Sequence, residues 1–130
     1  MRTEVVLRRN GEEFVVRLTR SQVLAMREAL TFLRHRDLGE HVLALQLGTT
    51  AKAVDGLVER LDVDTAEPVE VRFRWDELHT VHAALTSVAT MFLSDGRLSQ
   101  EAFRTRLGFF RENLDGLALG IADAVREVAG

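Results

Sequence analysis

Three side chains able to bind a metal ion recur three residues apart along one predicted helix. They are Asp76, His79 and His82. This spacing puts them on one side of the helix, and imidazole and carboxylate groups are ligands that zinc accepts. His79, however, points away from the apolar stripe of the helix and His82 lies at its border, and no other histidine is placed to complete a tetrahedral set. We therefore interpret both as surface histidines and expect no metal and no cofactor, while a metal or small-molecule binder remains a third hypothesis.

Residues 94–103 are similar to the second half of an EF-hand calcium loop, with Gly96 at the sixth position. That alignment puts Met91, Leu93 and Ala102 at the first, third and twelfth positions. None of these side chains carries a carboxylate, so we expect a plain loop and no calcium site.

Catalytic motifs are missing from the sequence. It has no Cys and no Tyr, no Gly-rich phosphate loop and no G-x-S-x-G elbow. No His is placed near a Ser in a recognisable pattern. We therefore predict that the protein is not an enzyme.

Residues 42–57 resemble a helix-turn-helix, with Ala44 in the first helix, Gly48 at the turn and Val54 on the second helix. The second helix would expose Lys52 beside two acidic side chains, which is a poor surface to set against phosphates. We therefore keep a DNA-binding regulator that uses residues 40–61 as the alternative function and not as the main one.

Two features near the C-terminus suggest contact surfaces. Gly116 and Gly120 are four residues apart on the last predicted helix, where they permit close approach of another helix, either inside the fold or between subunits. Phe109 and Phe110 are adjacent, so on a helix they point about 100° apart, and one of them is expected at the surface. We predict that these four residues contact a partner.

Composition fits one globular domain over residues 1–130. The chain is 46% hydrophobic and 28% charged, with a net charge of −3. Residues 1–61 carry ten basic and eight acidic side chains, a surplus too small for a nucleic-acid binder. No run of about 18 apolar residues occurs and the N-terminus is charged, so we expect a cytoplasmic protein without a membrane segment.

The elements that would position these residues begin with a hairpin. Alternating apolar residues flank Asn10 and Gly11, the dipeptide favoured in a type I′ turn. This turn predicts the pairs Arg9–Glu12, Arg8–Glu13, Leu7–Phe14, Val5–Val16 and Glu4–Arg17. The predicted buried face holds Val5, Leu7, Phe14, Val16 and Leu18, and the other face is mostly charged. Residues 69–75 alternate in the same way and predict a third strand.

The chain also aligns with itself. Residues 16–31 match residues 71–86, and Leu-Gly and Asp-Gly-Leu recur 60 residues apart. Each unit reads as a strand followed by three helical segments. The first helices carry apolar stripes at Val23, Met26, Leu30 and Leu33 and at Leu78, Val81, Leu85 and Val88.

Together these patterns predict an α+β fold in which a small antiparallel sheet, the hairpin plus a third strand, packs against helices. Two diverged copies, about 12–61 and about 68–128, would be related by a pseudo-two-fold axis. We expect a non-enzymatic protein–protein interaction module, such as an adaptor, an immunity or antitoxin-like protein or a regulatory partner. Its partner would be another protein, a second copy of itself, or both, and not nucleic acid.

Overall fold

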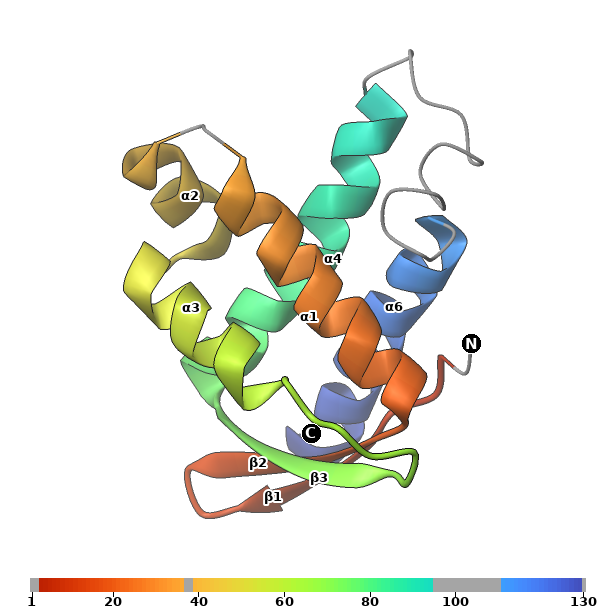
Figure 1. Cartoon of the computed structure of the whole chain (residues 1–130). Coiled ribbons are helices and arrows are strands. Elements are labelled where there is room, and N and C mark those ends of the chain that lie inside the picture. The colour runs from red at the N-terminus through yellow and green to blue at the C-terminus, as the bar shows by residue number, and fades with distance from the viewer. Residues whose placement is uncertain (1–2, 37–38, 95–110, 130) are drawn as a thin grey trace.

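The computed structural model describes residues 3–36, 39–94 and 111–129, in which five helices lie on one side of a three-stranded antiparallel sheet (Figure 1). The strands are β1 (Val6–Asn10), β2 (Glu13–Leu18) and β3 (Val69–Arg74). The helices are α1 (Arg20–His35), α2 (Glu40–Leu47), α3 (Ala51–Arg60), α4 (Trp75–Ser94) and α6 (Arg111–Ala129). The predicted α+β class with a small antiparallel sheet is confirmed.

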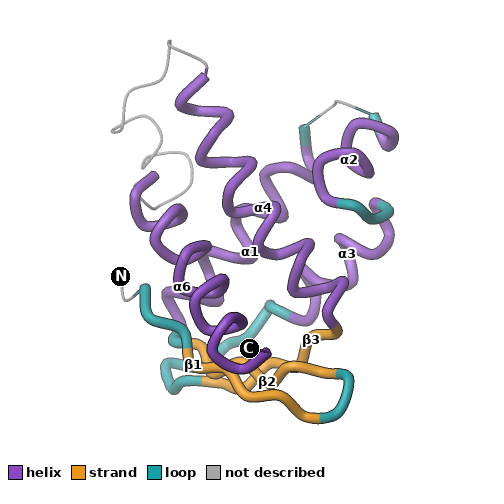
Figure 2. The backbone as a smooth tube through the Cα atoms, turned by 180° about the vertical axis from the view of Figure 1, so that it is seen from behind, coloured by secondary structure: helices purple, strands orange, loops and turns teal. Residues whose placement is uncertain are grey.

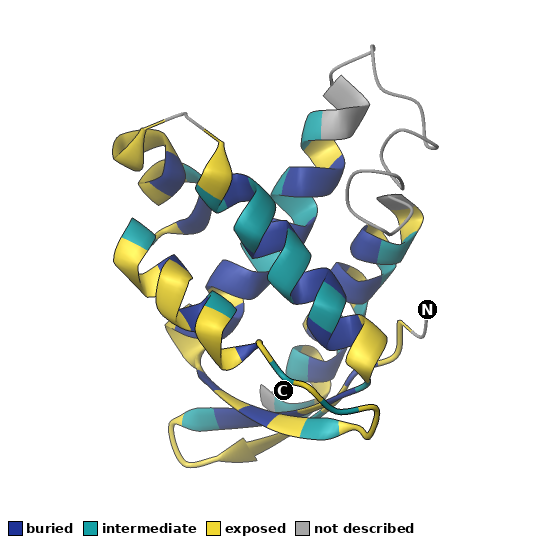
Figure 3. Ribbon diagram, viewed as in Figure 1, coloured by how far each residue is buried: buried dark blue, intermediate teal, exposed yellow. Residues whose placement is uncertain are grey.

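The sheet has the order β1-β2-β3 and buries one face beneath the helices. On this face Phe14 lies opposite Phe73 and Val16 lies opposite Val71. All four side chains are buried. Figure 3 colours the ribbon by the burial of each residue. Of the predicted buried face, Val5, Phe14, Val16 and Leu18 are buried and Leu7 is half-buried, so the strand alternation identified the correct face.

The predicted hairpin register is wrong by two residues. The structure pairs Leu7 with Val16 and Asn10 with Glu13, so the two loop residues are Gly11 and Glu12. Gly11 has φ +67°, and only glycines adopt positive φ among the described residues. A type I′ turn would need positive φ at Asn10 as well, whereas Gly at the first loop position matches a type II′ turn. Because the shift is even, every side chain keeps its predicted face.

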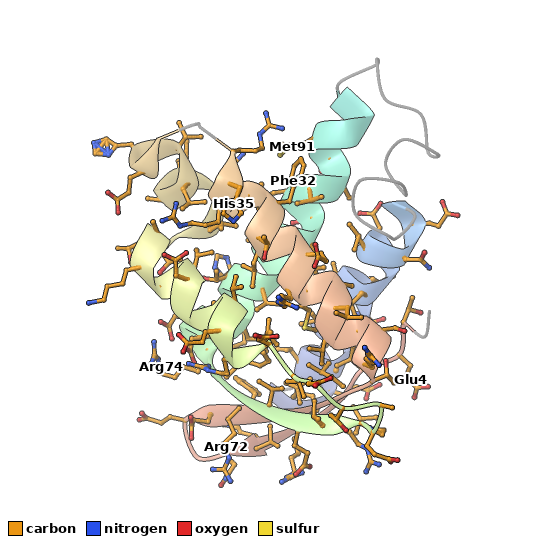
Figure 4. All side chains as sticks on the ribbon, in the orientation of Figure 1. Glu4, Phe32, His35, Arg72, Arg74 and Met91 are labelled. Carbon is orange, nitrogen blue, oxygen red and sulfur yellow. The ribbon has the colours of Figure 1, made fainter. Side chains whose placement is uncertain are left out.

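The outer face of the sheet is charged, as expected, but one apolar side chain on this face is buried. Val15 is only 2% exposed, although it lies on this face between Arg8 and Arg72. The Arg8 guanidinium on β1 reaches across β2 to bind the Glu70 carboxylate on β3. Arg72 projects from the sheet away from the helices (Figure 4). The aliphatic part of the Arg8 side chain therefore spans Val15, as long cationic side chains often do over apolar surface.

Helix α1 begins with a capping box. Thr19 Oγ1 accepts a hydrogen bond from the Gln22 backbone N–H at 3.2 Å, and Gln22 Oε1 accepts one from the Thr19 N–H at 2.9 Å. The amide of Gln22 also donates to the Glu4 carbonyl at 2.9 Å, which ties the N-terminal segment to α1. The predicted stripe residues of α1 and α4 are all buried: Val23, Met26, Leu30, Leu33, Leu78, Val81, Leu85 and Val88.

Helices α1 and α4 form the centre of the helical layer and pack against each other. Helix α6 packs against α4, and α3 packs against α1. Figure 2 shows that α6 and the α2–α3 pair lie on opposite sides of this central pair, as Figure 1 does from the front. Helix α2 also contacts α4, where the Thr80 hydroxyl donates to the Leu47 carbonyl at 3.2 Å.

Among the described helices, none is both long and apolar enough to cross a lipid bilayer. A cytoplasmic location and the single-domain division with its two repeats stay predictions.

Candidate interaction surfaces

The junction between β3 and α4 exposes the single tryptophan of the chain. Strand β3 ends at Arg74 and α4 begins at Trp75, with no loop between them. The Trp75 side chain packs on Phe14 with ring centroids 5.7 Å apart and planes tilted by 47°. Phe14 is 6% exposed, whereas Trp75 is 58% exposed. One side of the indole is therefore fixed on the core while much of the ring faces solvent.

An exposed ion pair lies beside Trp75 at this junction. The Arg74 guanidinium donates to both carboxylate oxygens of Asp76, at 3.1 and 3.2 Å. The Arg74 backbone N–H donates to Glu77 Oε1 at 2.9 Å. The hydrogen bond from Arg74 lowers the pKa of the Asp76 carboxyl, so the carboxylate form is favoured. Trp75 thus lies between two residues whose side chains bind each other.

A hollow of about 570 Å³ lies between the Trp75 side chain and the β1–β2 turn. It is lined by Arg9, Glu12, Glu13, Phe14, Arg74, Trp75 and Asp76. We call it the Trp75 hollow. Five of its seven lining residues are charged and two are aromatic, so it differs from the mostly apolar pockets that hold small molecules. Tryptophan and arginine are also the residues that most often carry binding energy at protein interfaces.

Glu77, the next carboxylate along α4, faces the other way. It accepts hydrogen bonds from both terminal nitrogens of Arg60 on α3, at 3.0 and 2.7 Å, and it is 9% exposed. Arg60 also donates to the Arg72 carbonyl at 3.0 Å. The hydrogen bonds from Arg60 lower the pKa of the Glu77 carboxyl. This pair occupies polar groups on the free edge of β3 and joins it to α3 and α4, so its role is structural.

Helix α2 presents a second apolar surface. Leu45 is 85% exposed and Val42 is 38% exposed, although both are large aliphatic side chains. The helix ends at Leu47; the Gly48 N–H still donates to the Ala44 carbonyl at 2.7 Å, and the left-handed backbone of Gly48 (φ +69°) then turns the chain away. Helix α3 then starts after the N-cap Thr50. We call Val42 and Leu45 together the α2 patch.

The lengths of α2, turn and α3 match the helix-turn-helix expectation, but two details differ. Ala44 is exposed, whereas a helix-turn-helix buries this small residue where its two helices meet. On α3 the exposed Asp55 is bound by Arg34 at 2.8 and 3.3 Å, which leaves Lys52, Glu59 and Arg60, itself bound to Glu77, as its other exposed charges. The surface set against DNA would therefore carry little positive charge.

The predicted contact glycines lie against the N-terminal segment of the same chain. A Cβ atom at Gly116 or Gly120 would overlap atoms of Thr3, and at Gly120 the overlapping atom is the Thr3 carbonyl oxygen. The internal close approach thus accounts for both glycines, and their contact with a partner stays a prediction. Phe109 and Phe110 lie outside the described residues, so their predicted partner contact also stays a prediction.

The structure describes the two histidines of the candidate metal motif but not the loop that resembles an EF-hand. His79 is exposed and His82 is half-buried, and burial, with His79 nearby, lowers the pKa of His82. Within residues 3–36, 39–94 and 111–129, no group of three metal-binding side chains is brought together. The EF-hand-like loop lies, beyond Ser94, outside the described residues.

Trp75 and Glu77 were not identified from the sequence as site residues, and Asp76 was considered only as a metal ligand beside His79 and His82. Alternation with Val71 and Phe73 puts Trp75 on the buried face of a continuing strand. The sequence does contain a signal for the helix start, because acidic residues such as this Asp-Glu pair are favoured in the first turn of a helix. A helix that begins at this pair would have ended the predicted strand before Trp75.

Comparison of the chain with protein-family models, with curated proteins and with solved structures finds no match.

Proposed function

We propose that this protein is a non-enzymatic interaction module that contacts another protein, a second copy of itself, or both, with Trp75 as an anchor of the contact. The observation that carries the proposal is a 58% exposed Trp fixed between Phe14 and an ion pair beside a hollow. A side chain held in place before binding loses little entropy on binding, which is typical of anchor residues. Adaptors, immunity or antitoxin-like proteins and regulatory partners act in this way.

Peptide selection on two matched proteins tests the proposal. Random peptides displayed on phage are selected on the wild-type protein and on Trp75→Ala. We expect peptides that are enriched on the wild type and not on Trp75→Ala, because the exposed indole supplies their main contact. Equal enrichment on both proteins, together with a monomer at all concentrations in sedimentation, would contradict the proposal.

Self-association is the second part of the proposal, and the exposed α2 patch supports it. Sedimentation velocity over a hundredfold concentration range, on wild type, Leu45→Ser, Phe109→Ala and Phe110→Ala, separates the candidate contacts. We expect Leu45→Ser and one of the two Phe variants to weaken association without lowering the melting temperature. If all three variants associate like the wild type, none of these residues forms the contact.

The alternative function is DNA binding through residues 40–61, which the helix lengths around Gly48 favour. The exposed Ala44 and the paired Asp55 oppose it. A gel shift at low salt with mixed duplexes should show only weak binding. Tight binding that is lost in Lys52→Glu would replace the interaction proposal with this one.

We also infer that residues 12–61 and 68–128 are diverged copies related by a two-fold axis. Two observations support this: Val16 lies directly opposite Val71, its equivalent in the alignment, and α1 packs on α4. A two-fold axis between two antiparallel strands passes through one pair of opposing residues and exchanges them, so these two residues must be equivalent. Superposing residues 16–31 and 38–61 on 71–86 and 98–121 in an experimental structure tests it, and helices of different order would overturn it.

A further inference from the structure

The charges around the Trp75 hollow indicate what kind of side chain it binds. Arg74 is flanked by Asp76, to which it donates two hydrogen bonds, and by Glu77, with a nitrogen–oxygen distance of 3.8 Å. Glu13 lies opposite Arg74 in the sheet register. These three carboxylates raise the pKa of Arg74, so the Arg74 cation is already neutralised. Asp76 and Glu13 line the hollow, whereas Glu77 lies outside it and is bound by Arg60.

The remaining charges of the hollow are on the β1–β2 turn. Glu12 is exposed and has no ion pair or hydrogen bond within the described part of the chain. Arg9 uses its Nε to donate to the Gly11 carbonyl at 3.1 Å. Three carboxylates therefore line the hollow against two guanidinium groups. Neither Glu12 nor the half-buried Glu13 has an ion pair among the described residues, and Glu12 is the more exposed of the two.

Resting on the interaction role proposed above, we propose that the Trp75 hollow binds a basic segment of a partner protein, with an arginine or lysine side chain packed on the Trp75 indole and Glu12 as its counter-ion. Trp is the aromatic side chain that attracts cations most strongly. An acidic segment would meet Glu12, Glu13 and Asp76 at close range. A purely apolar segment would leave the Glu12 carboxylate facing its uncharged surface.

Fluorescence titration tests this directly, because Trp75 is the only Trp and the chain has no Tyr. The probes are an acetylated tri-arginine amide and a matched acetylated tri-glutamate amide, at low ionic strength. We expect the tri-arginine peptide to change the Trp75 emission saturably and the tri-glutamate peptide to leave it unchanged. Raising the salt concentration should weaken the tri-arginine binding, because the Glu12 contact is exposed.

Three charge variants make the test specific for the hollow. Glu12→Gln should weaken the tri-arginine peptide about threefold, and Arg9→Gln should strengthen it about twofold by removing a like charge. Glu67→Gln is the matched control, because Glu67 is exposed on another loop and should leave binding unchanged. All three positions are exposed, and equal melting temperatures will show that each variant folds.

The outcomes separate this inference from the proposed function. Saturable binding of the tri-glutamate peptide, no response to tri-arginine at millimolar concentration, or equal affinity of Glu12→Gln and wild type would each overturn the basic-segment inference. Peptides that are selected through Trp75 but carry no basic residue would overturn it too, while the interaction role would stand. Absence of Trp75-dependent selection, together with a monomer at all concentrations in sedimentation, would overturn the role as well.

Discussion

Two neighbouring carboxylates at the start of α4 form the same kind of bond in different surroundings. Asp76 and Glu77 each accept two hydrogen bonds from one arginine, Asp76 from Arg74 and Glu77 from Arg60. The Asp76 pair is exposed beside the Trp75 hollow, whereas Glu77 is buried between α3, α4 and β3.

Burial decides what each pair contributes. An exposed ion pair gains little net free energy, because water solvates both charges when they separate. Loss of the partner from a buried charge leaves that charge without solvation, which is costly. We infer that the Glu77 side of the junction supports the fold, and that the Asp76 side is free to serve binding.

The largest expected effect concerns the ring beneath Trp75. Phe14→Ala should lower the free energy of unfolding by about 3–5 kcal/mol, the usual cost of deleting a buried Phe. Urea unfolding followed by circular dichroism measures it. An effect below about 1 kcal/mol would mean that Phe14 belongs to the surface and not to the core.

A smaller effect should follow from breaking the Arg60–Glu77 pair. Glu77→Gln should lower the free energy of unfolding by about 1–2 kcal/mol, because the hydrogen bonds that the buried carboxylate accepts from Arg60 and from the Arg74 N–H weaken, while Arg60, whose side chain is 40% exposed, stays solvated. Asp76→Asn is the matched control one residue away, and it should unfold at nearly the wild-type urea concentration. Equal effects of the two substitutions would remove the contrast between the two pairs.

The same contrast predicts a pH dependence. The folded-state pKa of Glu77 lies below its ordinary value of 4.5, so the unfolded chain binds the proton more readily. The stabilisation is therefore complete above about pH 4.5 and is lost as the pH falls through the lowered pKa. The difference in unfolding free energy between wild type and Glu77→Gln should shrink between pH 5 and pH 3, roughly the range where Glu carboxyls titrate. A difference that stays constant over this range would show that the negative charge of Glu77 does not stabilise the fold.

Periodicity predicted the parts of the fold that depend on burial alone. The stripes of α1 and α4 and the buried face of the hairpin follow from it, because a wrong phase would expose several apolar side chains together. The hairpin register was missed since Asn10-Gly11 and Gly11-Glu12 both give Gly11 a positive φ, and the two registers bury the same face.

The candidate site depends on a boundary that periodicity does not mark. Trp75 continues the alternation of β3, yet it is the first residue of α4 and is largely exposed. Which arginine binds Asp76 and which binds Glu77 depends on where α3 packs, and the local sequence does not contain that information. For this reason the sequence pointed to Phe109 and Phe110 as aromatic contacts and not to Trp75.

The central claim is that Trp75 serves binding and Phe14 beneath it serves the fold, and Trp75→Ala tests it most directly. Its stability, followed by circular dichroism, is measured together with its affinity for a peptide selected on the wild type. We predict a loss of stability well below that of Phe14→Ala, because Trp75 is already 58% exposed, and a tenfold or greater loss of affinity, roughly the cost of removing an aromatic anchor. A loss of stability equal to that of Phe14→Ala with unchanged affinity would contradict the claim and make Trp75 a part of the core.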